Sequence, residues 1–201
     1  MQLLETLCFQ NGEFQNIDYH LARFENARKA LFGLTDDLSL EEKLIEYVST
    51  KQLDVAQVYR CRVLYGHDIE KIELVNYQFK KIERVKLFQI PYNYDYGFKW
   101  AKRSFFATIL AQQPDFDEVL MVQNNRLTDI TIANIALFDG KKWITPAHPL
   151  LKGTKRQFLL DSKMIEEGVI EVQDLQHFQR ITFINTFRGL ENSIAVSQIE
   201  I

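Results

Sequence analysis

The chain has 201 residues, of which 46% are hydrophobic and 25% charged, and its formal net charge at pH 7 is −3. This length corresponds to one large domain or two small ones, and the acidic balance excludes a general affinity for nucleic acid or membrane surfaces. No apolar stretch approaches the roughly 20 residues of a membrane span. The first residues lack a charged region followed by an apolar run, so we expect no signal peptide. We therefore expect a cytoplasmic protein. Its two cysteines, Cys8 and Cys61, lack metal-ligand spacing and are expected to be buried, reduced thiols.

The first part of the chain mixes strand and helix patterns. Asn11-Gly12 is a strong hairpin-turn signal, Asp18 is expected to cap a helix, and Gly33 is a plausible stop for that helix. Ser39, followed three positions later by a glutamate, predicts a capping box for a second helix. The patterns predict strands at residues 2–10, 14–17, 55–65 and 69–79, and helices at residues 19–31 and 40–50.

The second part is richer in strands. A turn-rich connector at residues 91–97 favours a boundary just before it, which gives a small domain at residues 1–82 and a larger one at residues 83–201. Asn124-Asn125 and Asp139-Gly140 predict hairpin turns. Strands are expected at residues 85–90, 118–123, 127–130, 133–138, 141–145, 169–172, 181–184 and 194–199, and helices at 99–112, 153–167 and 174–178. Strand runs with segregated helices indicate the α+β class.

Three pieces of the larger domain stand out in order and spacing. They are Lys99-Trp-Ala-Lys-Arg103, then Leu127-Thr-Asp-Ile-Thr-Ile-Ala-Asn134, then Thr145-Pro-Ala-His-Pro-Leu-Leu-Lys-Gly-Thr-Lys-Arg156. Together they resemble the aminotransferases of class IV, the enzymes of fold type IV that depend on pyridoxal 5′-phosphate (PLP). That family includes branched-chain aminotransferases, D-amino acid aminotransferases and 4-amino-4-deoxychorismate lyases. The resemblance covers nearly the whole chain and implies two domains like those of D-amino acid aminotransferase, a small N-terminal α/β sandwich and a larger, β-rich C-terminal domain.

PLP chemistry explains why such pieces belong together. The cofactor needs a lysine amine for a Schiff base, and it needs a carboxylate that keeps its pyridine nitrogen protonated. Its phosphate needs backbone N–H groups at the start of a helix and an arginine. The sequence offers Lys99, Asp129 and the run from Gly153 to Arg156 in these places.

Two of these assignments have a rival or a departure. The family lysine lies in a Lys-x-x-Asn-Arg-like setting, and in this chain Lys102 stands where the family has the asparagine. Lys102 is therefore a rival for the role of the Schiff-base lysine. We prefer Lys99 because it aligns with the family lysine. The family motif Val-Thr-Glu-x-x-x-x-Asn becomes Leu-Thr-Asp-x-x-x-x-Asn here, so Asp129 replaces a glutamate and Asn134 ends the motif. The shorter carboxylate requires that the ring lie closer or that a water intervene.

Further residues follow from the resemblance. The segment His20-Leu-Ala-Arg23 is similar to the family's His-x-x-Arg-Leu, in which the arginine reaches the phosphate. The resemblance implies that PLP is bound by Arg23, Lys99, Asp129, Asn134, Gly153, Thr154, Lys155 and Thr186.

Substrate binding is assigned to two places. The loop of Thr186, Phe187 and Arg188 is similar to the family loop that holds phosphate and the substrate carboxylate. Arg60 and Arg62 share one face of a strand and need an anionic partner, either a substrate or an internal acid such as Glu5.

The function implied is a PLP-dependent enzyme that acts on an amino acid or an amino-chorismate-type substrate by transamination or lyase chemistry. The alternative is a PLP-binding or interaction protein that keeps the scaffold without catalysis. The N-terminal segment that builds the substrate pocket in the family is represented only by Leu4-Glu5-Thr6. Because a partner subunit closes the active site in that family, the resemblance implies a homodimer, with no nucleic-acid or membrane partner.

Overall fold

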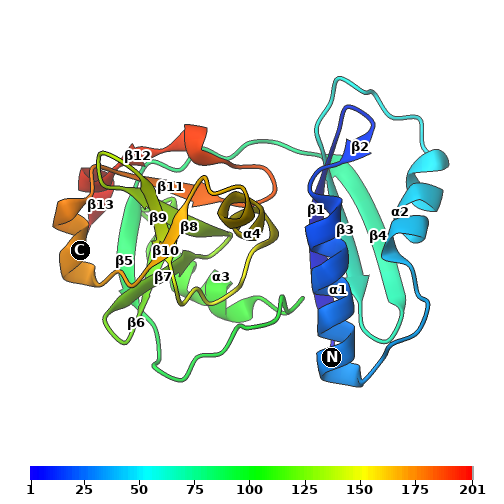
Figure 1. Ribbon diagram of the computed structural model, residues 1–201, viewed down its shortest axis with the longest axis horizontal. Helices are drawn as coiled ribbons and strands as arrows, with labels where there is room; N and C mark the ends of the chain where they lie inside the picture. Colours follow the sequence, from blue (N-terminus) through cyan, green and yellow to red (C-terminus); the bar gives the residue numbers. More distant parts are fainter. Residues whose placement is uncertain (201) are drawn as a thin grey trace. The chain divides into compact units, whose positions relative to one another are not determined.

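The computed structural model describes residues 1–200, which form two compact units, each with its own core (Figure 1). The first unit holds residues 1–79 and 98–102, and the second holds residues 80–97 and those from 103 onward. This division differs from the predicted one at residue 82 in one respect that matters for the site, because residues 98–102 pack with the first unit. Among the helices of residues 1–200, none has the length and apolarity that crossing a bilayer needs.

A four-stranded antiparallel sheet in the order β2-β1-β3-β4 forms the frame of the first unit. One face of this sheet carries α1 and α2 (Figure 1). Side chains alternate along β3, so that Cys61, Val63 and Tyr65 are buried in the core with Phe24 of α1 and Leu44 of α2. The elements are β1 (Leu3–Gln10), β2 (Glu13–Phe14), α1 (Ile17–Phe32), α2 (Leu40–Ser49), β3 (Tyr59–Tyr65) and β4 (Ile69–Asn76).

The helix ends of this unit match the sequence predictions with one exception. Gly33 is left-handed (φ 69°) and donates its N–H to the carbonyl of Lys29, and Ser39 Oγ accepts the N–H of Glu42 at 3.1 Å. The Asp18 cap is wrong, because a left-handed Asn16 turns the chain and α1 begins at Ile17. The same turn ends the hairpin strand at residue 14 rather than 17.

The predicted helix at residues 99–112 is also wrong in its first part. Residues 99–101 are extended and lie along the edge of β1: the Leu4 N–H donates to the Lys99 carbonyl at 2.9 Å, and the Ala101 N–H donates to the Gln2 carbonyl at 3.0 Å. The short β2 covers only the far end of β1, which leaves backbone groups here to be satisfied by another segment. The helix itself, α3 (Ser104–Ala111), begins only after this segment.

The second unit is built on a mixed sheet in the order β10-β9-β8-β7-β6-β5-β13, with β11 and β12 attached through β8. β8 is central: β11 pairs along its whole length, and β7 and then β9 pair with successive parts of it. The strands are β5 (Val85–Gln89), β6 (Glu118–Gln123), β7 (Arg126–Ile130), β8 (Ala133–Phe138), β9 (Trp143–Pro146), β10 (Glu166–Gly168), β11 (Arg180–Ile184), β12 (Ile194–Ala195) and β13 (Ile199–Glu200).

Turns in this unit confirm some predictions and correct others. Asn124 and Asn125 are both left-handed, as a two-residue hairpin requires, and Gly140 has φ 98°. The helix after Gly153, α4 (Thr154–Asp161), is shorter than predicted, because a left-handed Lys163 redirects the chain into β10. That strand replaces the one expected at residues 169–172. A 3-10 turn at residues 196–198 divides the expected terminal strand into β12 and β13. The predicted α+β class is confirmed.

Candidate active site

Glu5 anchors a polar cluster inside the first unit. Its carboxylate projects from the helix-facing side of β1 and is fully buried. His20 and Arg23, three residues apart on one face of α1, both reach it. His20 Nδ1 lies 2.7 Å from Glu5 Oε2, while Arg23 donates from Nε to Oε1 at 2.8 Å and from Nη2 to Oε2 at 2.5 Å. A bidentate guanidinium pair of this kind fixes both side chains.

The charges of this cluster follow from its burial. Burial alone would raise the pKa of Glu5, but the charge of Arg23 and hydrogen bonds from His20 and Arg23 lower it to about 2. Burial lowers the pKa of His20, and the charges of Arg23 and Lys99 act in the same direction against the hydrogen bond to Glu5. Because the ionised Glu5 can only accept, His20 donates its proton from Nδ1.

Lys99 lies beside this cluster, since its charge acts on His20. Its carbonyl is fixed to the N–H of Leu4, so pairing with β1, rather than a helix start, sets its place in the chain. The residue is half-buried, whereas Lys102 is exposed. The first unit thus places a half-buried lysine within electrostatic reach of His20 in the cluster of Glu5, His20 and Arg23.

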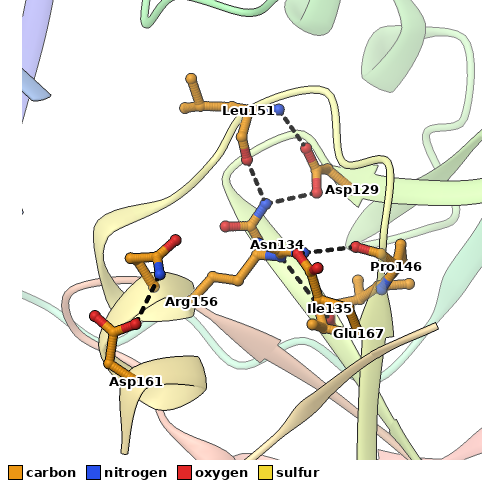
Figure 2. Close-up of polar contacts among 10 residues, drawn as sticks. Asp129, Asn134, Ile135, Pro146, Leu151, Arg156, Asp161 and Glu167 are labelled. Carbon is orange, nitrogen blue, oxygen red and sulfur yellow. Dashed lines mark hydrogen bonds and ion pairs between the residues drawn. The ribbon is translucent and has the colours of Figure 1, made fainter. Parts of the chain in front are cut away.

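Asp129 is the best-defined polar group of the second unit (Figure 2). It lies in β7 opposite Asn134 of β8, and it is almost fully buried. Asn134 Nδ2 donates to Asp129 Oδ1 and to the Leu151 carbonyl, both at 2.7 Å. The Leu151 N–H donates to Asp129 Oδ2 at 3.0 Å. Each carboxylate oxygen therefore accepts a hydrogen bond from a neutral amide.

These neutral donors do not compensate for the loss of water. Burial raises the pKa of Asp129 to about 6, although the hydrogen bonds from Asn134 and Leu151 lower it. A cationic hydrogen-bond donor would stabilise the ionised form. A protonated pyridine nitrogen is such a donor, so the oriented, buried carboxylate fits the ring of PLP.

Gly153 fits closely behind this group. A Cβ atom at this position would lie 2.0 Å from Asn134 Oδ1. Its φ of −73° is open to any residue, so the requirement is one of space rather than of backbone conformation. The buried Thr154 follows and opens α4, and Lys155 places its Nζ 4.7 Å from the ring centre of Phe158. Glycine here therefore lets the helix start approach the amide that orients Asp129.

Arg156, in the first turn of α4, anchors the loop between β9 and α4. Its side chain is buried and donates from Nη2 to the Pro146 carbonyl at 2.8 Å and to Glu167 at 2.6 Å, and from Nε to Thr145 at 3.3 Å (Figure 2). The guanidinium of Arg156 is therefore bound to acceptors of β9 and β10. Arg156 thus holds the loop between β9 and α4, which carries Leu151.

A tight turn follows β11 at residues 185–188. The backbones of Asn185 and Arg188 exchange two hydrogen bonds, at 3.1 and 3.2 Å. Asn185 Oδ1 accepts the Phe187 N–H at 2.9 Å. Arg188 is buried and donates from Nη2 to the carbonyl of Lys80. Thr186 and Phe187, half-buried, form the tip of the turn.

Comparison with known proteins decides the family. The model of the amino-transferase class IV family matches residues 2–192. The chain belongs to the class IV aminotransferases. An uncharacterized protein of Haemophilus influenzae is 36% identical over 191 residues, which are 94% of this chain and 98% of that protein.

Two crystal structures are similar to this class IV chain. One, named as a putative 4-amino-4-deoxychorismate lyase from Haemophilus somnus 129pt, has a TM-score of 0.85 and 30% identity and covers 94% of this chain and 97% of its own. The other, an aminotransferase from Brucella abortus bound to PLP, has a TM-score of 0.71 and 16% identity and covers 92% and 77%. The second likeness shows the fold alone. The predicted fold type IV is confirmed, and members of the family bind PLP.

The predicted site residues of this class IV chain fall into separate groups. Asp129, Asn134, Gly153 and Thr154 come together in the second unit, with Thr186 in the turn after β11. Arg23 and Lys99 lie in the first unit, where Arg23 holds Glu5 with two of its nitrogens. The assignment of Arg23 to the phosphate stays a prediction.

The structure decides one of the two alternatives for the anionic partner of Arg60 and Arg62. Glu5 is not their partner, because it lies on the opposite face of the sheet and binds His20 and Arg23. Arg62 lies 3.8 Å from Glu73 of β4, and Arg60 is exposed. A substrate as their anionic partner stays a prediction.

Sequence reasoning did not find the anchoring role of Glu5 or the amide of Leu151. The signal for Glu5 was present, since His20 and Arg23 share one helix face next to an acid in an apolar strand. No residue pattern in the sequence indicates that the Leu151 N–H binds Asp129, because the direction of a backbone N–H depends on the conformation of its loop. Glu118, whose buried carboxylate accepts the Thr131 hydroxyl at 2.6 Å, was read only as the start of a strand.

Proposed function

We propose that this class IV aminotransferase is a PLP-dependent enzyme that acts on a small amino substrate by transamination or lyase chemistry. The observation that carries the proposal is Asp129. It is buried and oriented through both oxygens by neutral amides, burial raises the pKa of its carboxyl to about 6, and a cationic partner in direct contact would further stabilise the ionised form.

PLP, when bound, supplies an electron sink for the bond that is broken at the amino-bearing carbon of the substrate. We assign Asp129 to hold the proton on the ring nitrogen, oriented by Asn134 and the Leu151 amide. Lys99 is assigned to bind the cofactor covalently and to carry the proton that leaves the substrate.

The phosphate is assigned to a set of groups with suitable donors. The opening amides of α4, Thr154 and Lys155, offer N–H groups at a helix start, and Lys155 adds a positive charge. Thr186 adds a hydroxyl and Arg23 a guanidinium. Since two Arg23 nitrogens are held by Glu5, this residue would act as a fixed cation rather than as a flexible one.

The substrate carboxylate is assigned to Arg60, Arg62 and the turn of Phe187 and Arg188. Arg60 and Arg62 stand on the sheet face away from α1 and α2.

Two reaction types are compatible with this site. In a transaminase the amino group passes to a second substrate, whereas in a lyase a fragment of the substrate is released. The similarity to a protein named as a putative 4-amino-4-deoxychorismate lyase supports an amino-chorismate-type substrate as well as an amino acid.

The test is a spectroscopic screen of the protein saturated with PLP. Amino acids of both hands, and amino-chorismate-type compounds, are added in turn, and the absorbance of the cofactor is followed. We expect a change with at least one class of substrate, and none in the Lys99→Ala variant. Lys102→Ala, which alters the exposed neighbouring lysine, is the matched control and is expected to respond like the wild type. PLP binding without any response would favour a non-catalytic PLP-binding protein.

A further inference from the structure

The turn between β7 and β8 is held by side chains from three other elements. Its two residues, Thr131 and Ile132, follow Asp129 closely in the chain. Glu118 of β6 accepts the Thr131 hydroxyl at 2.6 Å and its N–H at 3.3 Å. Arg103, just before α3, donates to the Thr131 carbonyl. Asn185, just after β11, donates from Nδ2 to the Ile132 carbonyl at 3.2 Å. Glu118 and Arg103 thus make this turn a fixed point of the second unit.

Asn185 uses both ends of its amide. Oδ1 accepts the Phe187 N–H and so closes the turn of residues 185–188 from within. Nδ2 reaches out of that turn to the Ile132 carbonyl. A side-chain amide carries its acceptor and its donor on separate atoms, whereas a hydroxyl has both on one oxygen. The side chain therefore ties the turn that carries Thr186 to the fixed turn after Asp129.

The sheet joins the same two places a second time. Asp129 pairs with Asn134 across β7 and β8, and Asn134 pairs with Ile184 across β8 and β11. Asn185 is the next residue after Ile184. The strand ladder consequently sets the root of the turn across β8 from Asp129. The Asn185 amide sets the direction in which the tip of the turn leaves the sheet.

We propose that Asn185 is a positioning residue, which holds Thr186 and the Phe187 amide in register with Asp129. The inference rests on the proposed function, because it takes Thr186 as a phosphate ligand. It adds a residue that acts through its neighbours: the ring is oriented by Asp129, the phosphate is bound at Thr186, and Asn185 fixes the spacing between these two contacts.

A comparison of PLP with pyridoxal, which lacks the phosphate, tests the proposal. Asn185→Ala removes both hydrogen bonds, and we expect its dissociation constant for PLP to rise about tenfold, as the loss of two ordinary hydrogen bonds implies. Its affinity for pyridoxal should stay that of the wild type. Asn192→Ala is the matched control, since Asn192 lies in the same segment but its amide donates to the exposed Glu191. This control should bind both ligands like the wild type.

A second variant separates the two ends of the amide. In Asn185→Ser, the hydroxyl can still accept the Phe187 N–H but is too short to reach Ile132. We expect Phe187 amide exchange in the cofactor-free protein to be fast in Asn185→Ala and close to the wild type in Asn185→Ser. The affinity of Asn185→Ser for PLP should nevertheless be reduced. Wild-type PLP affinity in the serine variant would show that the link to Ile132 positions nothing.

The outcomes distinguish this inference from the proposed function. Equal losses of PLP and pyridoxal affinity in Asn185→Ala would reveal a general effect on folding and overturn the inference alone. Unchanged affinity for PLP in that variant would do the same. A wild-type protein that binds no PLP would overturn the proposed function, and the inference with it.

Discussion

Two buried carboxylates in this chain have opposite properties because their partners differ. Glu5 receives a guanidinium and an imidazole N–H, and its pKa falls to about 2 despite its burial. Asp129 receives two neutral amides, and burial raises its pKa to about 6. The charge of Glu5 is therefore compensated by a cationic side chain of the protein itself. Asp129 is oriented but lacks a compensating charge in direct contact, which is why we assign it to the cofactor.

The Glu5 cluster predicts a dependence of stability on pH. The carboxyl titrates near 4.5 in the unfolded chain and at about 2 in the folded one, so the unfolded state binds more protons between these values. The stabilisation is present above pH 4.5 and is lost as the pH falls through 2. From about pH 5 to about pH 3 this group should remove about 2 kcal/mol from the free energy of unfolding.

Glu5→Gln should remove that contribution, so its stability should fall less steeply over the same range. At neutral pH the variant should be less stable than the wild type by about 3–5 kcal/mol, because Arg23 loses its buried anion. Urea unfolding of both proteins at the two pH values is the measurement. Parallel pH profiles would show that Glu5 is not the group responsible.

Asp129→Asn should separate cofactor binding from turnover. The amide keeps the size of the side chain and an oxygen for Asn134, but it has no charge to hold a proton on the ring nitrogen. We expect PLP to bind, with turnover reduced on the order of 10²-fold, the scale of losing one oriented electrostatic contact in an active site. Absorbance titration and single-turnover kinetics measure the two effects. Normal turnover would rule out the assigned role.

At the scale of elements, the loop between β9 and α4 is shaped to hold Asp129. Arg156 fixes its lower part to β9 and β10, the Leu151 backbone contacts both Asp129 and Asn134, and Gly153 leaves room for Asn134 (Figure 2). The sequence predicted a glycine at a helix start and a phosphate nearby. It could not predict that the space beside this glycine is filled by an asparagine from a strand some distance away in the chain.

Gly153→Ala should therefore act on Asp129 through Asn134. The new methyl group would have to displace the Asn134 amide, at a cost of about 1–3 kcal/mol in stability, as overpacking of a buried site usually has. PLP affinity should fall as well, because the carboxylate loses its orientation. Gly97→Ala is the control, since its Cβ would meet only the end of the Asp95 side chain, at 3.3 Å. Equal behaviour of the two variants would contradict this account of the loop.

The segment at residues 99–103 shows why the sequence predicted some elements and not others. Its residue types suit a helix, and the helix was predicted from Lys99. The structure uses the first residues as an extended partner of β1, because β2 leaves part of that edge open. Local propensity cannot reveal a vacant edge, which depends on pairing with distant residues. Hairpins at Asn124-Asn125 and Gly140, which depend on local turn chemistry, were predicted correctly.

At the scale of the whole molecule, the order of three short motifs was enough to predict the family and the fold. We attribute the order of the motifs around Lys99, Asp129 and Gly153 to the chemical needs of PLP, the cofactor that members of the family bind. The paths of loops, the lengths of helices and the partner of each arginine were not predicted, because these depend on packing. The division into domains at residue 82 likewise does not reveal that residues 98–102 pack with the first unit.

The homodimer stays a prediction, which rests on the resembling family, where a partner subunit closes the active site. A C2 pair is the common arrangement for such a protein. Sedimentation at micromolar concentration should give about twice the chain mass of 23.7 kDa. A monomer with full PLP-dependent activity would contradict the idea of a shared site.

The central claim is that PLP binds covalently to Lys99, and borohydride reduction tests it most directly. Reduction of the protein with PLP bound fixes the cofactor on its lysine, and peptide mass mapping then locates the pyridoxyl group. We predict it on Lys99, the half-buried lysine beside the Glu5 cluster. A pyridoxyl group on the exposed Lys102, or no labelled peptide at all, would contradict the account.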